Sequence, residues 1–318
     1  MRPELDRTAA EIEKVITGKR DVIERILTAL LADGHVLLDD VPGVGKTTLA
    51  AALCRAVGLE RRRVQFTPDV MPSDLVGFSM YRKERDEFEY RPGALNGIHL
   101  LLADEINRAS GRTQSALLEA MEERRVTVDG RTYALEKPFF VIATQNSVGT
   151  EGTRRLPYAQ MDRFLVRLRL GYPDREAQMT LLRERREEDP LERVEPVLTR
   201  ERLTEMQREV RQTDSGEEIL DYITRLTLAS REHPAVEIGI SPRGALFLER
   251  TARARAWAEG RDYVTGSDVR EVFRDVCAHR ILMKESAADQ SAEDVAEELL
   301  ERVENPDRHS RPAWMRKR

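Results

Sequence analysis

The segment VPGVGKTT at Val41–Thr48 constrains this chain more than any other stretch. It follows the apolar run HVLL and precedes LAAALCRAV, so a glycine-rich turn joins an expected strand to an expected helix. Gly43 and Gly45 allow the backbone to approach an anion with no Cβ in the way. The amide groups at the start of the following helix point at such an anion. The segment therefore predicts a loop that binds phosphate groups.

The side chains of this loop extend the prediction to a nucleoside triphosphate and its metal. Lys46 is placed to reach the β- and γ-phosphates, and the Thr47 hydroxyl is placed to ligate Mg2+. Val44 and Thr48 belong to the same phosphate-binding backbone. The pattern G-x-x-x-x-G-K-[ST] has one departure, because its first position is Asp40. Asp tolerates unusual backbone angles, so we expect the loop to form, with a charge near the phosphates that disfavours nucleotide.

Two further apolar strands end in polar residues. The run IHLLLADE ends in Asp104 and Glu105, and VIATQN ends in Asn146. In an open α/β sheet, ligands bind at the carboxyl ends of the strands. Asp104 is placed to hold Mg2+, Glu105 to polarise a water that attacks the γ-phosphate, and Asn146 to bond that water or phosphate. These residues predict ATP hydrolysis, which depends on positioning more than on covalent chemistry.

Strands and helices alternate along the first half of the chain, which predicts an α/β fold with a doubly wound parallel sheet. Helices are expected at residues 4–17 and 19–33. A β-hairpin is expected at Val126–Leu135, where the sequence alternates around Asp129-Gly130. The expected strands are His35–Leu38, Val64–Phe66, Ile98–Ala103, Phe139–Ala143 and Phe164–Leu170.

The character of the sequence changes after Gly171. We expect a nucleotide-binding core at residues 1–182, followed by a highly charged linker. Residues 197–283 are typical of an all-helical second domain. Residues 284–318 are typical of a polar, partly disordered tail, with an acidic helical stretch at 291–304 and disorder expected in the last dozen residues, 307–318.

Composition excludes several classes of protein. The two cysteines lie far apart and the five histidines are scattered, so neither a disulfide framework nor a zinc site is expected. The net charge of -5 argues against a nucleic-acid partner, and the basic cluster Arg61–Arg63 is expected to be a solvated face. We expect no membrane insertion, because no apolar run approaches the length of a membrane span.

Longer strings of this sequence resemble the MoxR-type AAA+ ATPases over roughly residues 10 to 285. They are TPDVMPSDLVGFSMYRKERDEFEYRPGAL, LLADEINRASGRTQSALLEAMEERRVTVDG, FVIATQNSVGTEGTRRLPYAQMDRF and ISPRGALFLERTARARAWAEGRDYVTGSDV. The resemblance implies a P-loop AAA+ core with a C-terminal all-helical lid domain. It also implies a helix-2 insert at about residues 67–95 and a pre-sensor-1 hairpin at 126–135.

The resemblance assigns further roles toward ATP. Asn146 matches the sensor-1 residue, and Arg243 matches the sensor-2 arginine. Arg163 matches the arginine finger that acts on the neighbouring subunit, with Arg154 and Arg155 as competitors for that role. Gly18 ends a segment that lies against adenine. A finger acting across subunits implies a hexameric ring.

The family match carries expectations about function, with alternatives. It implies a cytoplasmic remodelling chaperone that acts with a von Willebrand factor A domain partner in metal-centre insertion or complex maturation. The alternatives are the motor subunit of a magnesium-chelatase-like enzyme, a nucleic-acid-acting AAA+ motor, and a non-catalytic nucleotide switch. The sequence departs from the family pattern at Asp40, Ser147, Arg154-Arg155 and Tyr158. The last three departures fall in the segment expected at the intersubunit contact.

Overall fold

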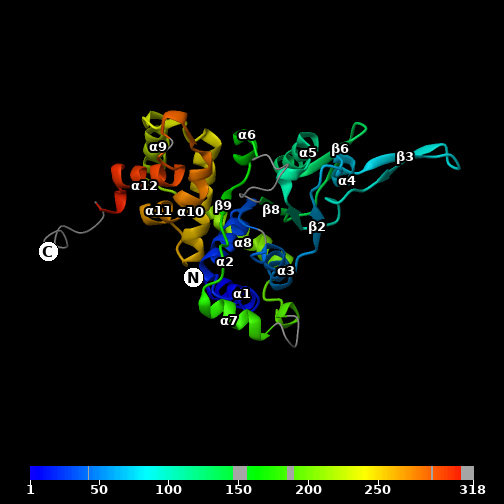
Figure 1. Cartoon of the computed structure of the whole chain (residues 1–318), viewed down its shortest axis with the longest axis horizontal. Helices are drawn as coiled ribbons and strands as arrows, with labels where there is room; N and C mark the ends of the chain where they lie inside the picture. Colours follow the sequence, from blue (N-terminus) through cyan, green and yellow to red (C-terminus); the bar gives the residue numbers. More distant parts are fainter. Residues whose placement is uncertain (42, 146–155, 185–189, 288, 309–318) are drawn as a thin grey trace. The chain divides into compact units, whose positions relative to one another are not determined.

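The computed structural model describes residues 1–41, 43–145, 156–184, 190–287 and 289–308 (Figure 1). Contacts divide the chain into two compact units. An α/β unit holds Pro3–Leu156 and Leu168–Thr204, and a helical unit holds Met1–Arg2, Pro157–Arg167 and Glu205–Arg318. The expected division into domains at residues 182 and 197 stays a prediction about which parts fold independently.

A five-stranded sheet has the strand order β2-β5-β8-β1-β9. The pairs β2/β5, β5/β8 and β8/β1 are parallel. Every residue of β1, β5 and β8 is buried, as expected for strands covered on both faces. The strands are β1 (Val36–Asp39), β2 (Arg61–Gln65), β5 (Leu100–Asp104), β8 (Phe140–Gln145) and β9 (Val166–Leu168). The parallel α/β fold expected from the sequence is thus confirmed.

The helices of the α/β unit carry apolar stripes. Leu5 and Ile12 of α1, and Ile23 and Leu30 of α2, are almost completely buried. The helices are α1 (Pro3–Glu13), α2 (Arg20–Leu31), α3 (Lys46–Ala56), α4 (Pro72–Val76), α5 (Gly111–Glu123) and α7 (Arg175–Glu184), and α8 (Arg200–Gln212) begins in this unit. No helix in the described ranges is both long and apolar enough to cross a membrane.

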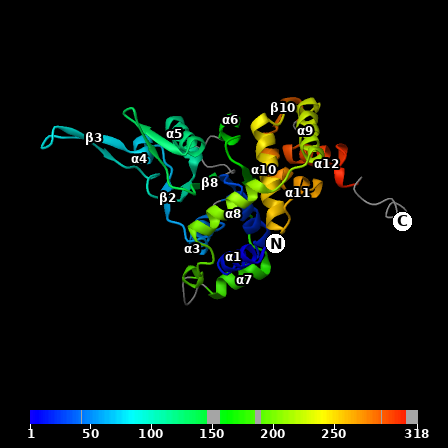
Figure 2. The same ribbon diagram turned by 180° about the vertical axis from the view of Figure 1, so that it is seen from behind.

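Two antiparallel hairpins extend the α/β unit. Strands β3 (Phe78–Arg82) and β4 (Glu87–Arg91) form the one that projects far from the sheet (Figures 1 and 2). Strands β6 (Arg125–Val128) and β7 (Arg131–Ala134) form the hairpin predicted around Asp129-Gly130. Both turn residues have positive φ, as a tight two-residue hairpin turn requires. The hairpins meet where Tyr90 stacks on Tyr133, with ring centroids 3.9 Å apart.

The helical unit contains α6 (Tyr158–Met161), α9 (Glu217–Glu232), α10 (Pro242–Ala258), α11 (Gly266–Cys277) and α12 (Ala292–Arg302). It also contains a short antiparallel pair, β10 (Val236–Ile238) with β11 (Leu282–Met283), that the sequence did not predict. Part of the expected polar tail belongs to this unit, because α12 buries Val295 and Leu299 completely. A capping box of Ser291 and Asp294 starts that helix. Of the last dozen residues, expected to be disordered, 307 and 308 belong to a short 3-10 helix, Pro306–Arg308, and 309–318 lie outside the described ranges.

Candidate nucleotide site

A cavity of about 620 Å³ lies entirely within the α/β unit. Its lining comes from the loop after β1, the start of α3, the ends of β2 and β5, and two segments at residues 15–19 and 171–181. Because the carboxyl ends of parallel strands meet at one edge of the sheet, this is the expected position for a ligand.

The glycine-rich loop supplies a cradle of backbone. Gly43 and Gly45 have φ of +85° and +94°, which an L-residue with a Cβ adopts only with strain. Gly45 precedes α3 with no side-chain cap, so the first amide groups of that helix need another acceptor. Val44, Lys46, Thr47 and Thr48 line the same cavity. This part of the cavity suits an anion.

Lys46 is the first residue of α3, and its side chain lines the cavity. It is buried, and its Nζ donates to the Asp40 carbonyl oxygen at 3.0 Å. Burial lowers the pKa of the ammonium below its usual value, although Asp40 and Asp104 nearby act in the opposite direction. A phosphate beside Lys46 adds a further negative group, which favours the charged ammonium.

Asp40 binds two backbone amides through its carboxylate. Its φ is not positive, and its side chain is not part of the cavity lining. One carboxylate oxygen accepts the Val41 amide at 2.8 Å and the other accepts the Gly171 amide at 2.6 Å. The carboxylate therefore ties the loop to the segment after β9, and the expected effect of its charge on nucleotide binding stays a prediction.

The two acidic residues at the end of β5 share one organising hydroxyl. Thr144 of β8 is completely buried, and its Oγ1 donates to Asp104 Oδ1 at 2.5 Å. Thr144 Oγ1 also accepts a hydrogen bond from the Glu105 amide, at 2.9 Å. Glu105 has φ of 56° and ψ of 48°, a left-handed conformation that costs energy for a residue with a Cβ. This bond supports the strained turn that places both carboxylates on the cavity.

Polar groups on both sides hold the acidic side chains. Arg63 pairs with Asp104 Oδ2, at 2.8 Å from Nη2. Glu105 Oε2 accepts Gln65 Nε2 at 2.9 Å and Arg108 Nη1 at 2.8 Å. Arg61–Arg63 are all exposed, as expected for a solvated face, and Arg63 and Gln65 also line the cavity.

Thr47 and Asp104 bring a hydroxyl and a carboxylate to the same cavity. Such hard oxygen ligands, few in number and next to a phosphate cradle, fit Mg2+ held jointly with a nucleotide. Elsewhere in the described part of the chain, no cluster of three or more His, Cys, Asp or Glu side chains is arranged to hold a metal.

The other end of the cavity is mainly apolar and suits a nucleobase. Gly18, predicted to lie against adenine, is not itself in the lining, but Thr17 and Lys19 on either side of it are. Its φ of +72° is that of a turn between α1 and α2. The apolar lining here consists of Val15, Ile16, Tyr172, Pro173, Ala177 and Leu181.

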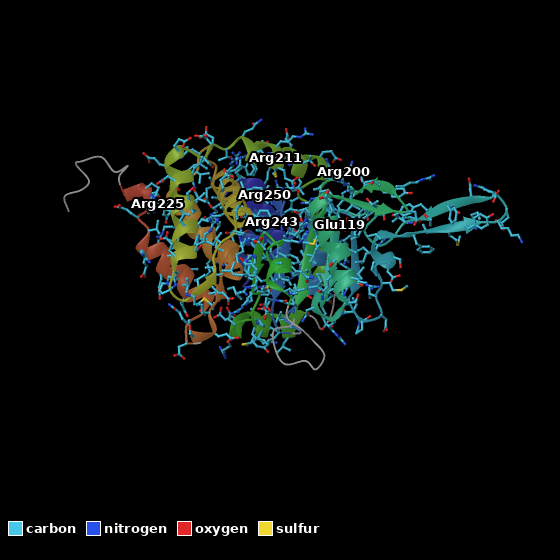
Figure 3. The ribbon with its side chains drawn as sticks, turned by 90° about the horizontal axis from the view of Figure 1, so that it is seen from above. Glu119, Arg200, Arg211, Arg225, Arg243 and Arg250 are labelled. Atoms are coloured by element: carbon cyan, nitrogen blue, oxygen red, sulfur yellow. The ribbon has the colours of Figure 1, made fainter. Side chains whose placement is uncertain are left out.

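The remaining predicted residues lie elsewhere. Asn146, Arg154 and Arg155 fall outside the described residues. Arg163 and Arg243 belong to the helical unit, where Arg243 lies at the start of α10, on the same helix as Arg250 (Figure 3). Because they belong to that unit, their roles toward a nucleotide stay predictions.

Within the helical unit, Asp162 joins the segments that carry these two arginines. Its carboxylate accepts the hydroxyl of Ser241, the N-cap of α10, at 3.1 and 3.2 Å. It also accepts Nε of the fully buried Arg280 at 2.8 Å. Tyr158, a departure from the family pattern, donates to the Arg280 carbonyl oxygen at 2.8 Å. The segment around Arg163 is thereby bonded to the start of the helix that carries Arg243.

Comparison with known proteins defines the class of this fold and site. Residues 35–166 match the ATPase family associated with various cellular activities, and residues 228–300 match the AAA lid domain. A crystal structure of a candidate ATPase from Cytophaga hutchinsonii has the same fold, with a TM-score of 0.88 and 35% identity. It covers 96% of this chain and 95% of its own. The chain is an AAA+ protein with a C-terminal lid.

Two sequence relatives identify the family. Chaperone MoxR1 of Mycobacterium tuberculosis is 39% identical, over 95% of this chain and 82% of its own length. The YeaC protein of Bacillus subtilis is 46% identical, over 96% of each chain. The chain belongs to the MoxR family of AAA+ ATPases, which confirms the resemblance found in the sequence.

Sequence reasoning missed the polar residues that hold Asp104 and Glu105. Thr144 was passed over inside an apolar strand, and Arg63 inside a basic cluster. No alternation marks either residue, because the strand of Thr144 is buried throughout and most of the strand of Arg63 is exposed.

Proposed function

We propose that this chain binds Mg-ATP in the cavity and hydrolyses it to ADP and phosphate. The observation that carries the proposal is the convergence of Lys46, Thr47, Asp104 and Glu105 on one cavity of the α/β unit. Each of these residues has a separate role in phosphoryl transfer to water.

The phosphate loop and the start of α3 bind the phosphates, and Lys46 neutralises the β- and γ-phosphates. Thr47 and Asp104 hold Mg2+, which neutralises charge on the phosphate oxygens when bound. Glu105 orients the attacking water and accepts its proton. Asn146 bonds that water or the γ-phosphate.

Arg243 and Arg163 complete the proposed reaction. Arg243 contacts the γ-phosphate of its own chain, and Arg163 reaches the ATP of the next subunit in a hexameric ring. An arginine suits both roles, because its planar cation spreads over several phosphate oxygens. The bonds of Asp162 to Ser241 and Arg280 support a coupled movement of the two arginines.

The biological role we propose is that of a cytoplasmic remodelling chaperone. A relative described as a chaperone, MoxR1, supports this proposal. The partner would carry a von Willebrand factor A domain, and the outcome would be metal-centre insertion or complex maturation. The projecting hairpin offers a contact surface, because Phe78, Tyr81 and Phe88 are each at least half exposed.

The first experiment measures ATP hydrolysis and mass in solution. Lys46→Ala should lose ATP binding and turnover, whereas Glu105→Gln should lose turnover and keep ATP bound. Lys83→Ala, at the turn of the projecting hairpin, is the matched control. Light scattering should show a rise in mass toward a hexamer on adding ATP. Unchanged turnover in Glu105→Gln would contradict the role of Glu105, and unchanged turnover in Lys46→Ala would contradict the proposed site.

A further inference from the structure

Arg63 is a cationic residue of the cavity that the proposed reaction does not yet use. Its guanidinium binds Asp104 Oδ2 through Nη2 at 2.8 Å and Nε at 3.3 Å. Nη2 also donates to Gln65 Oε1 at 2.9 Å. The side chain lines the cavity beside Lys46 and Glu105, and about half of it is exposed. It is therefore both close to the phosphate position and able to move.

The register of β2 against β5 places Arg63 on the face of the cavity and Arg62 on the opposite face. Gln65 lies directly opposite Asp104 in the β2/β5 pair, and Arg63 precedes it by two residues on the same face. Arg62 points to the other face and donates to the Gly93 carbonyl oxygen at 3.2 Å. This strand thus carries three consecutive arginines, Arg61 to Arg63, of which only Arg63 lines the cavity. Arg62 is a matched control for Arg63.

The partners of Asp104 show which contact can be exchanged. Oδ1 is held by Thr144, which is completely buried and also bonded to the Glu105 amide. Oδ2 is held by the half-exposed Arg63. If Asp104 ligates Mg2+, a divalent cation and a guanidinium compete for the same carboxylate and repel each other. Because Arg63 is half exposed and Thr144 is completely buried, Arg63 is the partner that can move away from Asp104.

Arg63 then needs another anion within reach. Glu105 already accepts Gln65 and Arg108 on Oε2. A bound nucleoside triphosphate brings a further anion, its γ-phosphate, to the same cavity. Arginine matches phosphate through several parallel N–H donors.

We infer that Arg63 exchanges Asp104 for the γ-phosphate when Mg-ATP binds, so that Arg63 makes the site prefer ATP to ADP. This inference rests on the proposed function. ADP has no γ-phosphate, so binding ADP with Mg2+ would separate Arg63 from Asp104 without offering a phosphate at the γ position in exchange. Arg63 therefore adds to the contacts that Lys46, Asn146 and Arg243 make with the γ-phosphate in the proposed function, and it supplies its own share of the preference for the triphosphate.

The test is calorimetric titration of the full chain with Mg-ADP and with the non-hydrolysable triphosphate Mg-AMP-PNP. In Arg63→Met, the preference for AMP-PNP over ADP should fall about tenfold or more, as expected for losing a hydrogen bond between two charged groups. Arg63→Lys, which keeps the charge without the planar donors, should lose part of the preference. Arg62→Met should bind both nucleotides as the wild type does.

The outcomes separate this inference from the proposed function. The role of Arg63 is overturned if Arg63→Met keeps the preference for AMP-PNP, or loses affinity for both nucleotides equally. The proposed function still stands in that case, provided that the wild type binds nucleotide and Lys46→Ala does not. A wild-type protein that binds neither nucleotide overturns the proposed function and this inference together.

Discussion

Thr144 connects the two carboxylates of the site through a single hydroxyl. It donates to Asp104 and accepts the Glu105 amide, and it has no exposure to solvent. Thr144→Val keeps the shape and removes both bonds. We expect ATP turnover to fall about ten- to a hundredfold, the usual effect of removing a group that orients a metal ligand. Steady-state ATP hydrolysis measures this effect.

Thr144→Ser is the control, because it keeps the hydroxyl and should retain most of the turnover. The unfolding temperature of each variant separates a catalytic effect from a loss of folding. Equal turnover in Thr144→Val and in the wild type would show that Asp104 and Glu105 need no support from β8.

Asp40 stabilises the phosphate loop through backbone amides. Its carboxylate accepts Val41 and Gly171, and a hydrogen bond to a charged group contributes about 1.5–3 kcal/mol. Asp40→Ala should therefore lower the free energy of unfolding by about 2 kcal/mol or more, visible as a lower melting temperature. Asp40→Asn keeps one acceptor oxygen and should lose less. Tighter nucleotide binding in Asp40→Ala, with unchanged stability, would instead support the charge effect expected from the sequence.

Helix α12 contributes buried apolar side chains to the helical unit, although its sequence is mostly acidic. Leu299 is completely buried in the helical unit, although acidic residues dominate its surroundings in the sequence. Leu299→Ala should destabilise that unit by about 2–5 kcal/mol, because it opens a cavity in a packed core. Glu297→Ala, on an exposed side of the same helix, should change stability by less than about 0.5 kcal/mol. Thermal unfolding followed by circular dichroism compares the two, and equal melting temperatures would mean that α12 is dispensable.

The sequence predicts the site residues that follow a local turn or end a strand, but it does not predict the contacts between neighbouring strands of the sheet. Lys46 and Thr47 follow a turn whose glycines are visible in the sequence, and Asp104 and Glu105 end a clear apolar strand. In contrast, the contact of Arg63 with Asp104 depends on the register between β2 and β5, which long-range packing decides. The sequence predicts the helix at residues 291–304, but Asp and Glu dilute its apolar stripe, so the burial of Val295 and Leu299 was not predicted.

At the scale of the whole molecule, each of the two units contains one buried cysteine, so thiol labelling can follow the opening of each unit separately. Cys54 lies on α3 in the α/β unit, and Cys277 ends α11 in the helical unit. Burial raises the pKa of both thiols to about 12. At pH 8, the reactive thiolate is then about a thousandfold scarcer than for a thiol with the usual pKa of about 9. Labelling by a disulfide reagent therefore requires the surrounding unit to open.

Cys277→Ala leaves Cys54 as the sole reporter, and Cys54→Ala leaves Cys277. We expect Mg-ADP to slow the labelling of Cys54 much more than that of Cys277, because a ligand stabilises the unit to which it binds. The time course of thiol labelling in mild urea, with and without Mg-ADP, measures both rates. Equal slowing at the two cysteines would mean that the units open together, so that nucleotide binding is transmitted through the whole fold. Rapid labelling in the absence of urea would contradict the burial of the thiols.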